Sequence, residues 1–497
     1  MDRTGETGAP KSDRHVVEIA GGRVAGAGAD VLAFKGLPFA APPVGPLRWQ
    51  RPAPVAAWTG VRDALQFGDD PVQAANPNLR GPRRSEDCLT LNVWTPRDRG
   101  AAPLPVLVWF PGGGYVAGAG SDRRFDGEAL AREGAVVVTC NYRVGLFGFL
   151  AHPRLSAADD GASGNYGLYD AVAALEWVRD NIAAFGGDPG CVTAFGVSAG
   201  SASVALLLTS PAVRGLFHRA ILQSAGAFRP LAPLADAEAA GATLGADIAA
   251  LRALSTEDAF ALTLRLVPKQ RGLTGARVLR PIRDGRILLQ DDRDAWQAGA
   301  FERMPLLIGN AADEGEMFVA NWTIATVDAY RRFLAETFGD AASAAAAVYP
   351  APDDAAVPAQ LAFLFGDSQF TYGGWGIGRA AARHGAPAWR YIFHRHPGGR
   401  AAPPEHGDDV PYAFGTWPAL AAEPPHDAGD RELSRRMMAC WREFAATGRP
   451  DSGFGDWPPC DPDGDRHLAM DLDSAPATAW RAEQMRFLDR YYDSRGS

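Results

Sequence analysis

Short, continuously apolar runs alternate with helical patterns through the first half of the chain. The runs at 105–110 (PVLVWF) and 135–141 (AVVVTCN) are rich in β-branched residues and do not alternate with polar ones. Strands buried on both faces of a parallel sheet have this character. Further strand-like runs lie at 191–196, 219–224, 305–310 and 386–394.

A helical pattern separates several of these runs. Apolar residues at spacings of three and four between 166 and 184 form one face of a long helix: Leu168, Val172, Leu175, Val178 and Ile182. Strand, helix, strand and helix in succession predict an α/β doubly wound fold, in which helices flank a central, mostly parallel, twisted sheet.

Two alanine-rich, mostly helical segments interrupt the later strands, at about 230–300 and 316–385. We expect them to be helical cap insertions over the carboxyl edge of the sheet, where α/β proteins bind ligands. The chain shows no internal repeat or low-complexity linker. We therefore expect a single catalytic domain over 15–497, preceded by a disordered tail at 1–14.

Composition and charge narrow the classes of function. The chain has 497 residues, of which 47% are hydrophobic and 22% charged, and a formal net charge of −9. The negative net charge argues against nucleic acid or an anionic membrane as a partner. Residues 1–14 lack an apolar signal region, and no run approaches the roughly 20 apolar residues of a membrane span. We therefore expect a cytoplasmic protein. The five cysteines show no metal-binding spacing, so we expect neither a metal nor another cofactor.

The strongest chemical signal is the motif Gly196-Val197-Ser198-Ala199-Gly200, directly after the run 191–196. A nucleophile on a sharp strand-to-helix turn needs small flanking residues, because the neighbouring backbone comes close. The motif favours Ser198 as a catalytic nucleophile. An ordinary tight turn would use the same residue types.

A glycine run, Gly112-Gly113-Gly114, follows the run 105–110 and precedes Tyr115. Glycines at a strand end allow backbone N–H groups to approach a substrate oxygen, as an oxyanion hole requires. A turn without a role, or a phosphate cradle, remains an alternative. A nucleotide fingerprint would need a helix-opening G-x-G-x-x-G and a later acidic residue, and neither is clear here.

Several longer blocks resemble the type-B carboxylesterase family, which includes cholinesterases and p-nitrobenzyl esterases. The resemblance extends over nearly the whole chain and implies the α/β-hydrolase fold. The segments 224–252 and 365–370 are further similar to bacterial fumonisin esterases within that family. The blocks that carry the family resemblance are FKGLPFAAPPVGPLRW (34–49), SEDCLTLNVWTP (85–96), NYRVGLFGFL (141–150), GNYGLYDAVAALEWVRDNIAAFGGDP (164–189) and GVSAG (196–200).

The resemblance implies roles for individual residues. It places the acid of the triad on Glu314 and the histidine on His406, in the order that α/β-hydrolases use. The residue pattern alone leaves the base open among the later histidines, with His396 the nearest rival, and leaves Asp313 and Glu316 as rivals for the acid. The resemblance also assigns the oxyanion donors to the amides of Gly113, Gly114 and Ala199, and a supporting position near the acid and histidine to Ser224.

The chain departs from many relatives at two positions of the site. Pro111 stands where a histidine or tyrosine usually precedes the glycines, and Val197 stands where a glutamate usually precedes the serine. Tyr115 and Val197 are candidate substrate contacts. The likeness to fumonisin esterases implies free carboxylates beside the ester, and Arg229 is a candidate to bind one through its planar fork.

These features predict a hydrolase of small carboxylic esters that acts through a Ser-His-Glu triad and a covalent acyl-enzyme. The same triad could serve carbamate or lactone hydrolysis or acyl transfer. A binding protein on the hydrolase scaffold is the alternative from another class.

Overall fold

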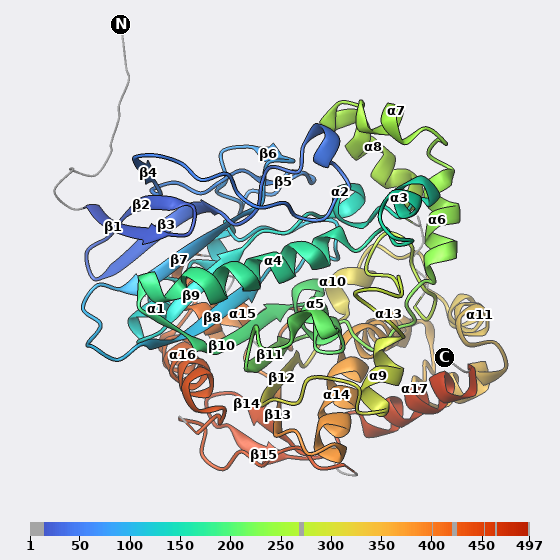
Figure 1. Cartoon of the computed structure of the whole chain (residues 1–497). Coiled ribbons are helices and arrows are strands. Elements are labelled where there is room, and N and C mark those ends of the chain that lie inside the picture. Colours follow the sequence, from blue (N-terminus) through green and yellow to red (C-terminus); the bar gives the residue numbers. More distant parts are fainter. Residues whose placement is uncertain are drawn as a thin grey trace, which may run out of the picture.

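One large twisted sheet organises the computed structural model, which describes residues 14–267, 273–399, 401–419, 425–451, 453–462 and 465–495 (Figure 1). Of the tail expected at 1–14, residues 1–13 lie outside the described residues, and Arg14 is the first residue of β1. The strands are β1 (Arg14–Ile19), β2 (Gly22–Ala27), β3 (Val31–Pro38), β4 (Val61–Asp63), β5 (Asp70–Pro71), β6 (Arg84–Ser85), β7 (Thr90–Pro96), β8 (Leu104–Phe110), β9 (Val136–Cys140), β10 (Gly187–Val197), β11 (Arg219–Gln223), β12 (Leu306–Ala311), β13 (Ala388–Phe393), β14 (His467–Met470) and β15 (Ala475–Ala477).

The centre of the sheet is parallel and its margins are antiparallel. The order of the main path is β1-β2-β3-β7-β9-β8-β10-β11-β12-β13-β14-β15, with β4 beside β2. From β9 to β14 every neighbouring pair is parallel. The strands expected from the six apolar runs are all present, which confirms the predicted doubly wound α/β architecture.

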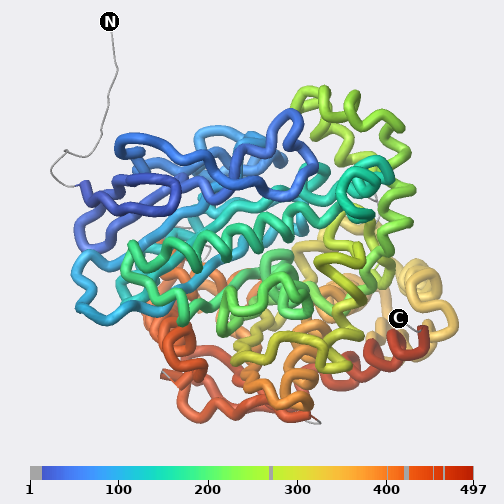
Figure 2. The backbone as a smooth tube through the Cα atoms, viewed as in Figure 1, coloured from blue at the N-terminus to red at the C-terminus, as the bar shows by residue number. Residues whose placement is uncertain are grey.

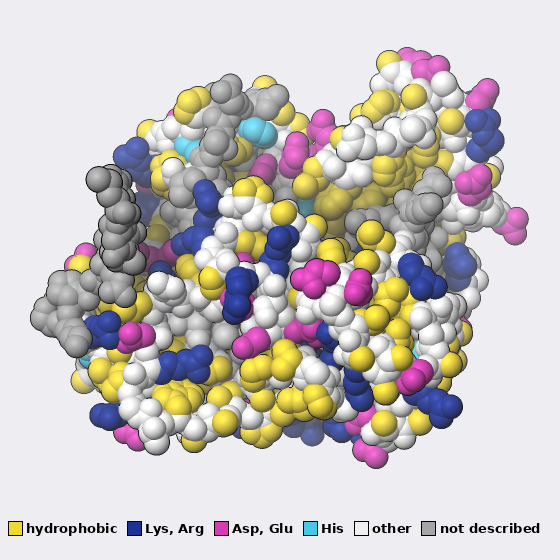
Figure 3. All heavy atoms as spheres, turned by 90° about the horizontal axis from the view of Figure 1, so that it is seen from above, with side chains coloured by type: hydrophobic (Ala, Val, Ile, Leu, Met, Phe, Trp, Pro, Cys, Tyr) yellow, Lys and Arg dark blue, Asp and Glu magenta, His cyan; other side chains and the backbone are white. Residues whose placement is uncertain are grey.

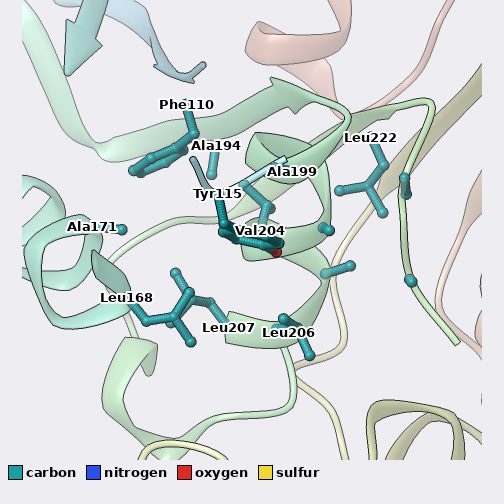
Figure 4. Packing of buried hydrophobic residues seen from close by; sticks show 14 of the residues in the cluster. Phe110, Tyr115, Leu168, Ala171, Ala194, Ala199, Val204, Leu206, Leu207 and Leu222 are labelled. Atoms are coloured by element: carbon teal, nitrogen blue, oxygen red, sulfur yellow. The ribbon is translucent and has the colours of Figure 1, made fainter. Parts of the chain in front are cut away.

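Side chains of the central strands pack on both faces of the sheet. Along β8, Val106, Val108 and Phe110 belong to one hydrophobic cluster. Leu107 and Trp109 belong to the cluster on the opposite face. Successive side chains of a strand point to opposite faces, so a strand that is apolar at every position must be covered on both sides. Figure 4 shows Phe110, Ala194 and Leu222 packing with residues of α4 and α5 on the first face.

Helices cover both faces. Residues of α4, α5, α14 and α17 join the first cluster, and residues of α1, α15 and α16 join the second. The helix predicted at 166–184 is α4, followed by a 3₁₀ turn at Ile182–Phe185. The α-helices are α1 (Glu128–Arg132), α2 (Gly145–Phe149), α3 (Pro153–Ala158), α4 (Tyr166–Asn181), α5 (Ala199–Leu207), α6 (Leu234–Ala242), α7 (Ile248–Arg252), α8 (Thr256–Leu266), α9 (Asp292–Gln297), α10 (Glu316–Val319), α11 (Val327–Phe338), α12 (Ala342–Val348), α13 (Val357–Gly366), α14 (Tyr372–Arg383), α15 (Val410–Phe414), α16 (Ala428–Thr447) and α17 (Ala482–Arg495).

The two interrupting segments are helical in the structure. Helices α6 to α9 lie within 230–300 and α10 to α14 within 316–385. The C-terminal helix α17 lies beside α11 and α12 (Figure 2), where Phe338 and Phe487 pack edge to face with centroids 5.2 Å apart.

The surface carries charges of both signs. On the face in Figure 3, basic and acidic side chains are interspersed, and hydrophobic side chains gather in a hollow. Within the described residues, no helix combines the length and the apolar character that a membrane crossing requires.

A buried ion pair ties α4 to the loop that precedes α2. Arg143 donates from Nε and Nη2 to the Asp170 carboxylate at 2.8 and 2.7 Å, and the Arg143 backbone N–H donates to the same group at 2.9 Å. The two side chains are 2% and 0% exposed. Because both charged groups are shielded from water, removing either one would leave the other as an unpaired buried charge.

Asp170→Ala should lower the free energy of unfolding by about 3–5 kcal/mol, because it leaves a buried guanidinium without its partner. The measurement is denaturant unfolding followed by circular dichroism. Glu128→Ala removes the exposed pair with Arg132 and should cost no more than about 0.5 kcal/mol. If both variants lost the same free energy of unfolding, burial of the Arg143–Asp170 pair would not explain its contribution.

Candidate active site

Two loops meet where the strand order reverses. The chain passes from β8 to β9 on one side and then to β10 on the other side of β8. Ligands of open α/β sheets bind at such a switch point, outside the carboxyl ends of the strands. The loop after β8 carries the glycine run, and the turn after β10 carries Ser198.

Ser198 occupies a strained turn between β10 and α5. Its φ of 56° and ψ of −120° are unfavourable for a residue with a side chain. Its N–H donates to the carbonyl of Gln223 at 3.0 Å. A Cβ on Gly196 would lie 2.7 Å from the Phe110 carbonyl oxygen, and a Cβ on Gly200 only 1.9 Å from it. Both flanking positions therefore require glycine, as the sequence motif predicted.

The glycine loop is held at both ends. Tyr142 donates its hydroxyl to the Pro111 carbonyl at 2.7 Å, and the N–H of Gly145 donates to the Tyr115 carbonyl at 2.6 Å. Gly113 has a φ of 128°, and a Cβ there would lie 2.2 Å from the Ala117 carbonyl oxygen. The loop can adopt this path only with glycine at that position.

A cavity of about 380 Å³ opens between these loops. Ser198 and His406 line it together with the three residues expected to supply oxyanion donors, Gly113, Gly114 and Ala199. Ala199 is the first residue of α5, and the first N–H groups of a helix have no partner within the helix. The candidate substrate contacts Tyr115, Val197 and Arg229 line the same cavity.

His406 and Glu314 are in direct contact. His406 Nδ1 lies 2.5 Å from Glu314 Oε2, and the two side chains are 8% and 1% exposed. The other oxygen, Oε1, accepts from Ser224 Oγ at 2.7 Å, Asn310 Nδ2 at 3.2 Å and the Ala311 N–H at 2.8 Å. The carboxylate is thus fixed on one side and turned to the histidine on the other.

Aromatic rings hold the imidazole in place. Phe370 lies with its centroid 4.1 Å from the His406 ring, and Phe318 meets the ring edge to face at 5.2 Å. Because Glu314 engages Nδ1, the opposite nitrogen Nε2 is the one available to reacting groups in the cavity. These apolar contacts limit the ring to one orientation.

The rival residues have other contacts. His396 Nδ1 lies 3.3 Å from the carbonyl oxygen of Pro397. Asp313 accepts from the N–H groups of Gly315 and Glu316, and Glu316 is an exposed residue in the first turn of α10. Of the described residues that line the cavity, His406 is the only histidine.

Sequence reasoning did not assign several residues that the structure brings to the cavity. Gln369 and Phe370 lie in a π-helical turn, Asp367–Thr371, between α13 and α14. Such turns frequently occur at functional sites, but their sequence signal is weak. Arg277 and Arg280 also line the cavity, and the Arg280 guanidinium lies over the Tyr115 ring at 5.3 Å.

Arg229 is one of several arginines that line the cavity. It donates from Nη1 to Gln369 Oε1 and from Nη2 to the Gly226 carbonyl at 3.2 Å. Burial, followed by repulsion from Arg280 and Arg277, lowers the pKa of Arg229 well below its ordinary value. No aspartate or glutamate is found among the described lining residues.

Asp409 is a buried carboxyl close to the histidine and its acid. Its Oδ2 accepts from Gln223 Nε2 at 2.9 Å and from the Tyr391 hydroxyl at 2.7 Å. Burial raises its pKa to about 6, against the effect of these two hydrogen bonds, and Glu314 and His406 act on it with opposite signs.

Comparisons with known proteins agree over nearly the whole chain. Residues 13–488 match the model of the Carboxylesterase family. The chain is 46% identical over 465 residues to the fumonisin B1 esterase of Sphingopyxis macrogoltabida, covering 91% of this chain and 85% of that protein. It is 36% identical over 451 residues to the para-nitrobenzyl esterase of Bacillus subtilis (strain 168), covering 86% and 88%. A solved structure of PNB esterase superposes with a TM-score of 0.83 at 33% identity, covering 95% of this chain and 99% of that one.

Asp409→Asn should change the dependence of stability on pH. The folded protein binds a proton at Asp409 more tightly than the unfolded chain, where the pKa of an aspartate is about 3.9. The resulting stabilisation is complete below about pH 4 and is lost as the pH rises through about 6. The variant cannot ionise, so it should gain on the order of 2 kcal/mol relative to the wild type between about pH 4 and pH 7.

Thermal unfolding across this pH range is the measurement. Asp98→Asn, at an exposed position, should leave the wild-type pH profile unchanged. Parallel profiles for the wild type and Asp409→Asn would mean that Asp409 is already ionised when buried.

Proposed function

This chain belongs to the carboxylesterase family and has the α/β-hydrolase fold, and we propose that it cleaves carboxylic esters through Ser198, His406 and Glu314 with a covalent acyl-enzyme. The contact of 2.5 Å between His406 Nδ1 and Glu314 Oε2 carries the proposal. A buried carboxylate at Nδ1 fixes the tautomer in which Nε2 can accept a proton.

Acylation begins when Ser198 Oγ attacks the ester carbonyl carbon. His406 Nε2 takes the hydroxyl proton, and Glu314 stabilises the imidazolium that forms. The N–H groups of Gly113, Gly114 and Ala199 donate to the oxyanion of the tetrahedral intermediate. The intermediate then collapses as the alcohol leaves with the proton from His406, and the acyl group remains on Ser198.

Deacylation repeats these steps with water. His406 takes a proton from the water as its oxygen attacks the acyl carbon, and the proton passes to Ser198 Oγ as the acid is released. Ser224, Asn310 and Ala311 hold Oε1 of Glu314 throughout. The strained backbone of Ser198 keeps the hydroxyl above the sheet edge in both steps.

The proposal includes the organisation of the chain. Residues 15–497 form one catalytic domain, and the segments at about 230–300 and 316–385 act as helical caps. Both segments supply walls of the cavity, for example Arg280 from the first and Phe318 from the second.

The acyl group of the preferred substrate carries at least one free carboxylate. Arg229, Arg277 and Arg280 line the cavity that Ser198 lines. The described hydrogen bonds of Arg229 go to neutral acceptors, Gln369 and Gly226, and a substrate carboxylate would compensate its partly buried charge through a charge-assisted hydrogen bond. A relative at 46% identity is named for fumonisin B1, which supports the same class of substrate.

Ser198→Ala and His406→Ala should each reduce kcat by at least about a thousandfold, and the double variant should be little worse, because the triad acts as a unit. Steady-state kinetics with an aryl ester is the measurement. Glu314→Gln should also reduce kcat strongly, since an amide can hold the imidazole in the wrong tautomer. A phosphonate ester should label Ser198, and labelling of Ser201 or Ser224 instead would refute the nucleophile.

Arg229→Ala should raise KM for tricarballylate esters by about tenfold to a hundredfold, because it removes a hydrogen bond between charged groups. KM for neutral aryl esters should stay within about twofold, since these esters make no such bond. Arg123→Ala, at an exposed arginine, is the matched control and should change neither. An equal rise for both kinds of ester would argue that Arg229 shapes the cavity without binding a carboxylate.

A further inference from the structure

Gln369 joins three separate segments in the wall of the reaction cavity, the one between the glycine loop and the proposed nucleophile. Its amide Nε2 donates to the Leu273 carbonyl at 2.9 Å. Its Oε1 accepts a hydrogen bond from Arg229 Nη1 and lies 3.5 Å from Arg277 Nη2. The side chain therefore links the π-helical turn to the loop after β11 and to the first of the two cap segments.

The contacts of Gln369 fix which way its amide group faces. The residue is only 1% exposed. A backbone carbonyl can only accept hydrogen bonds, so the amide atom that faces Leu273 must be the nitrogen. The amide oxygen then faces Arg229 and Arg277, as their donors require.

The turn that carries Gln369 is anchored away from the cavity. Asp367, two residues earlier, accepts from Arg481 Nε at 2.7 Å. The next residue, Phe370, packs against the His406 ring with centroids 4.1 Å apart. Two consecutive side chains of one π-helical turn thus contact the arginines and the proposed base.

Gln369 holds Arg229 without neutralising its charge. In the described part of the chain, the side-chain hydrogen bonds of Arg229 go to Gln369 and to the Gly226 carbonyl, which are both uncharged acceptors. Asp292 also interacts with the charge of Arg229, but its carboxylate oxygens accept from two backbone N–H groups at 2.8 and 2.9 Å. Each Nη group of an arginine carries two N–H bonds, so each retains one donor for a ligand.

We propose that Gln369 is a specificity-determining residue, whose amide oxygen orients Arg229 and Arg277 in the cavity wall while leaving their positive charge available to an anionic acyl group. The inference rests on the proposed preference for esters that carry a free carboxylate. A carboxylate in place of this amide would lie beside the same two guanidinium groups, pair with them and compete with the substrate. One buried side chain thus sets which substrate charge the cavity prefers.

Two benzyl esters of glutaric acid test the proposal, one with its second carboxyl group free and one with a carboxamide in that place. The full-length protein is assayed by the release of benzyl alcohol at physiological salt. The measured quantity is the selectivity, the ratio of kcat/KM for the carboxylate ester to kcat/KM for the carboxamide ester. Because both rates come from the same preparation, misfolding of a fraction of a variant does not change this ratio.

Gln369→Glu should lower the selectivity by at least about tenfold, chiefly through a higher KM for the carboxylate ester, because it brings two like charges together. Gln369→Met removes the acceptor with little change in volume. It should lower the selectivity by at least about threefold, since Arg229 loses the hydrogen bond that orients it. Gln290→Glu makes the same change of charge at an exposed position that does not line the cavity, and it should retain the wild-type selectivity.

Two results would overturn the role of Gln369 and leave the proposed function standing. If both Gln369 variants kept the wild-type selectivity while Arg229→Ala lost it, the carboxylate would be bound without help from Gln369. If the variants raised KM equally for the two esters, Gln369 would shape the cavity without selecting charge. A wild type that did not favour the carboxylate ester would instead refute the proposed substrate class, and this inference with it.

Discussion

The buried ion pair between Arg143 and Asp170 is the interaction on which the arrangement of the site depends. It fixes the loop before α2 to α4, and that loop holds both ends of the glycine run through Tyr142 and Gly145. Because separating two desolvated charges is costly, the pair tolerates little displacement. The path of the glycine loop beside Ser198 is therefore set by a contact that lies outside the reaction cavity.

The cavity has both aromatic and cationic residues in its walls. Phe318 and Phe370 pack against the ring of His406, the proposed base. Arg229, Arg277 and Arg280 line the same cavity, and the described lining residues include no carboxylate. In the proposed mechanism, the low local dielectric strengthens the interaction of His406 with Glu314 and the attraction between these arginines and an anionic acyl group.

Local chemistry explains which features could be predicted from the sequence. The continuous apolar runs are typical of strands covered on both faces, and successive side chains of β8 from Val106 to Phe110 belong to the two opposite clusters in turn. The glycines at 196 and 200 predicted that another backbone segment lies close to this turn. In the structure that segment is the carbonyl group of Phe110. By contrast, the π-helical turn that carries Gln369 and Phe370 has no distinctive pattern, because it differs from an α-helix by one added residue in a turn. The burial of Asp409 could not be predicted either, because it depends on Gln223 from β11 and Tyr391 from β13, which are distant in the sequence.

The sequence by itself determined the order of strands and helices, the strained turn at Ser198 and the need for glycine around it, because these follow from neighbours along the chain. The tertiary structure decided which histidine meets which acid. His406 and Glu314 are 92 residues apart, and only the packing of β12 against the sheet and of His406 against Phe318 and Phe370 brings them together. It also decided that Arg229, Arg277 and Arg280 share one cavity, because the charge on a surface or in a cavity is a sum over distant segments that no local pattern records.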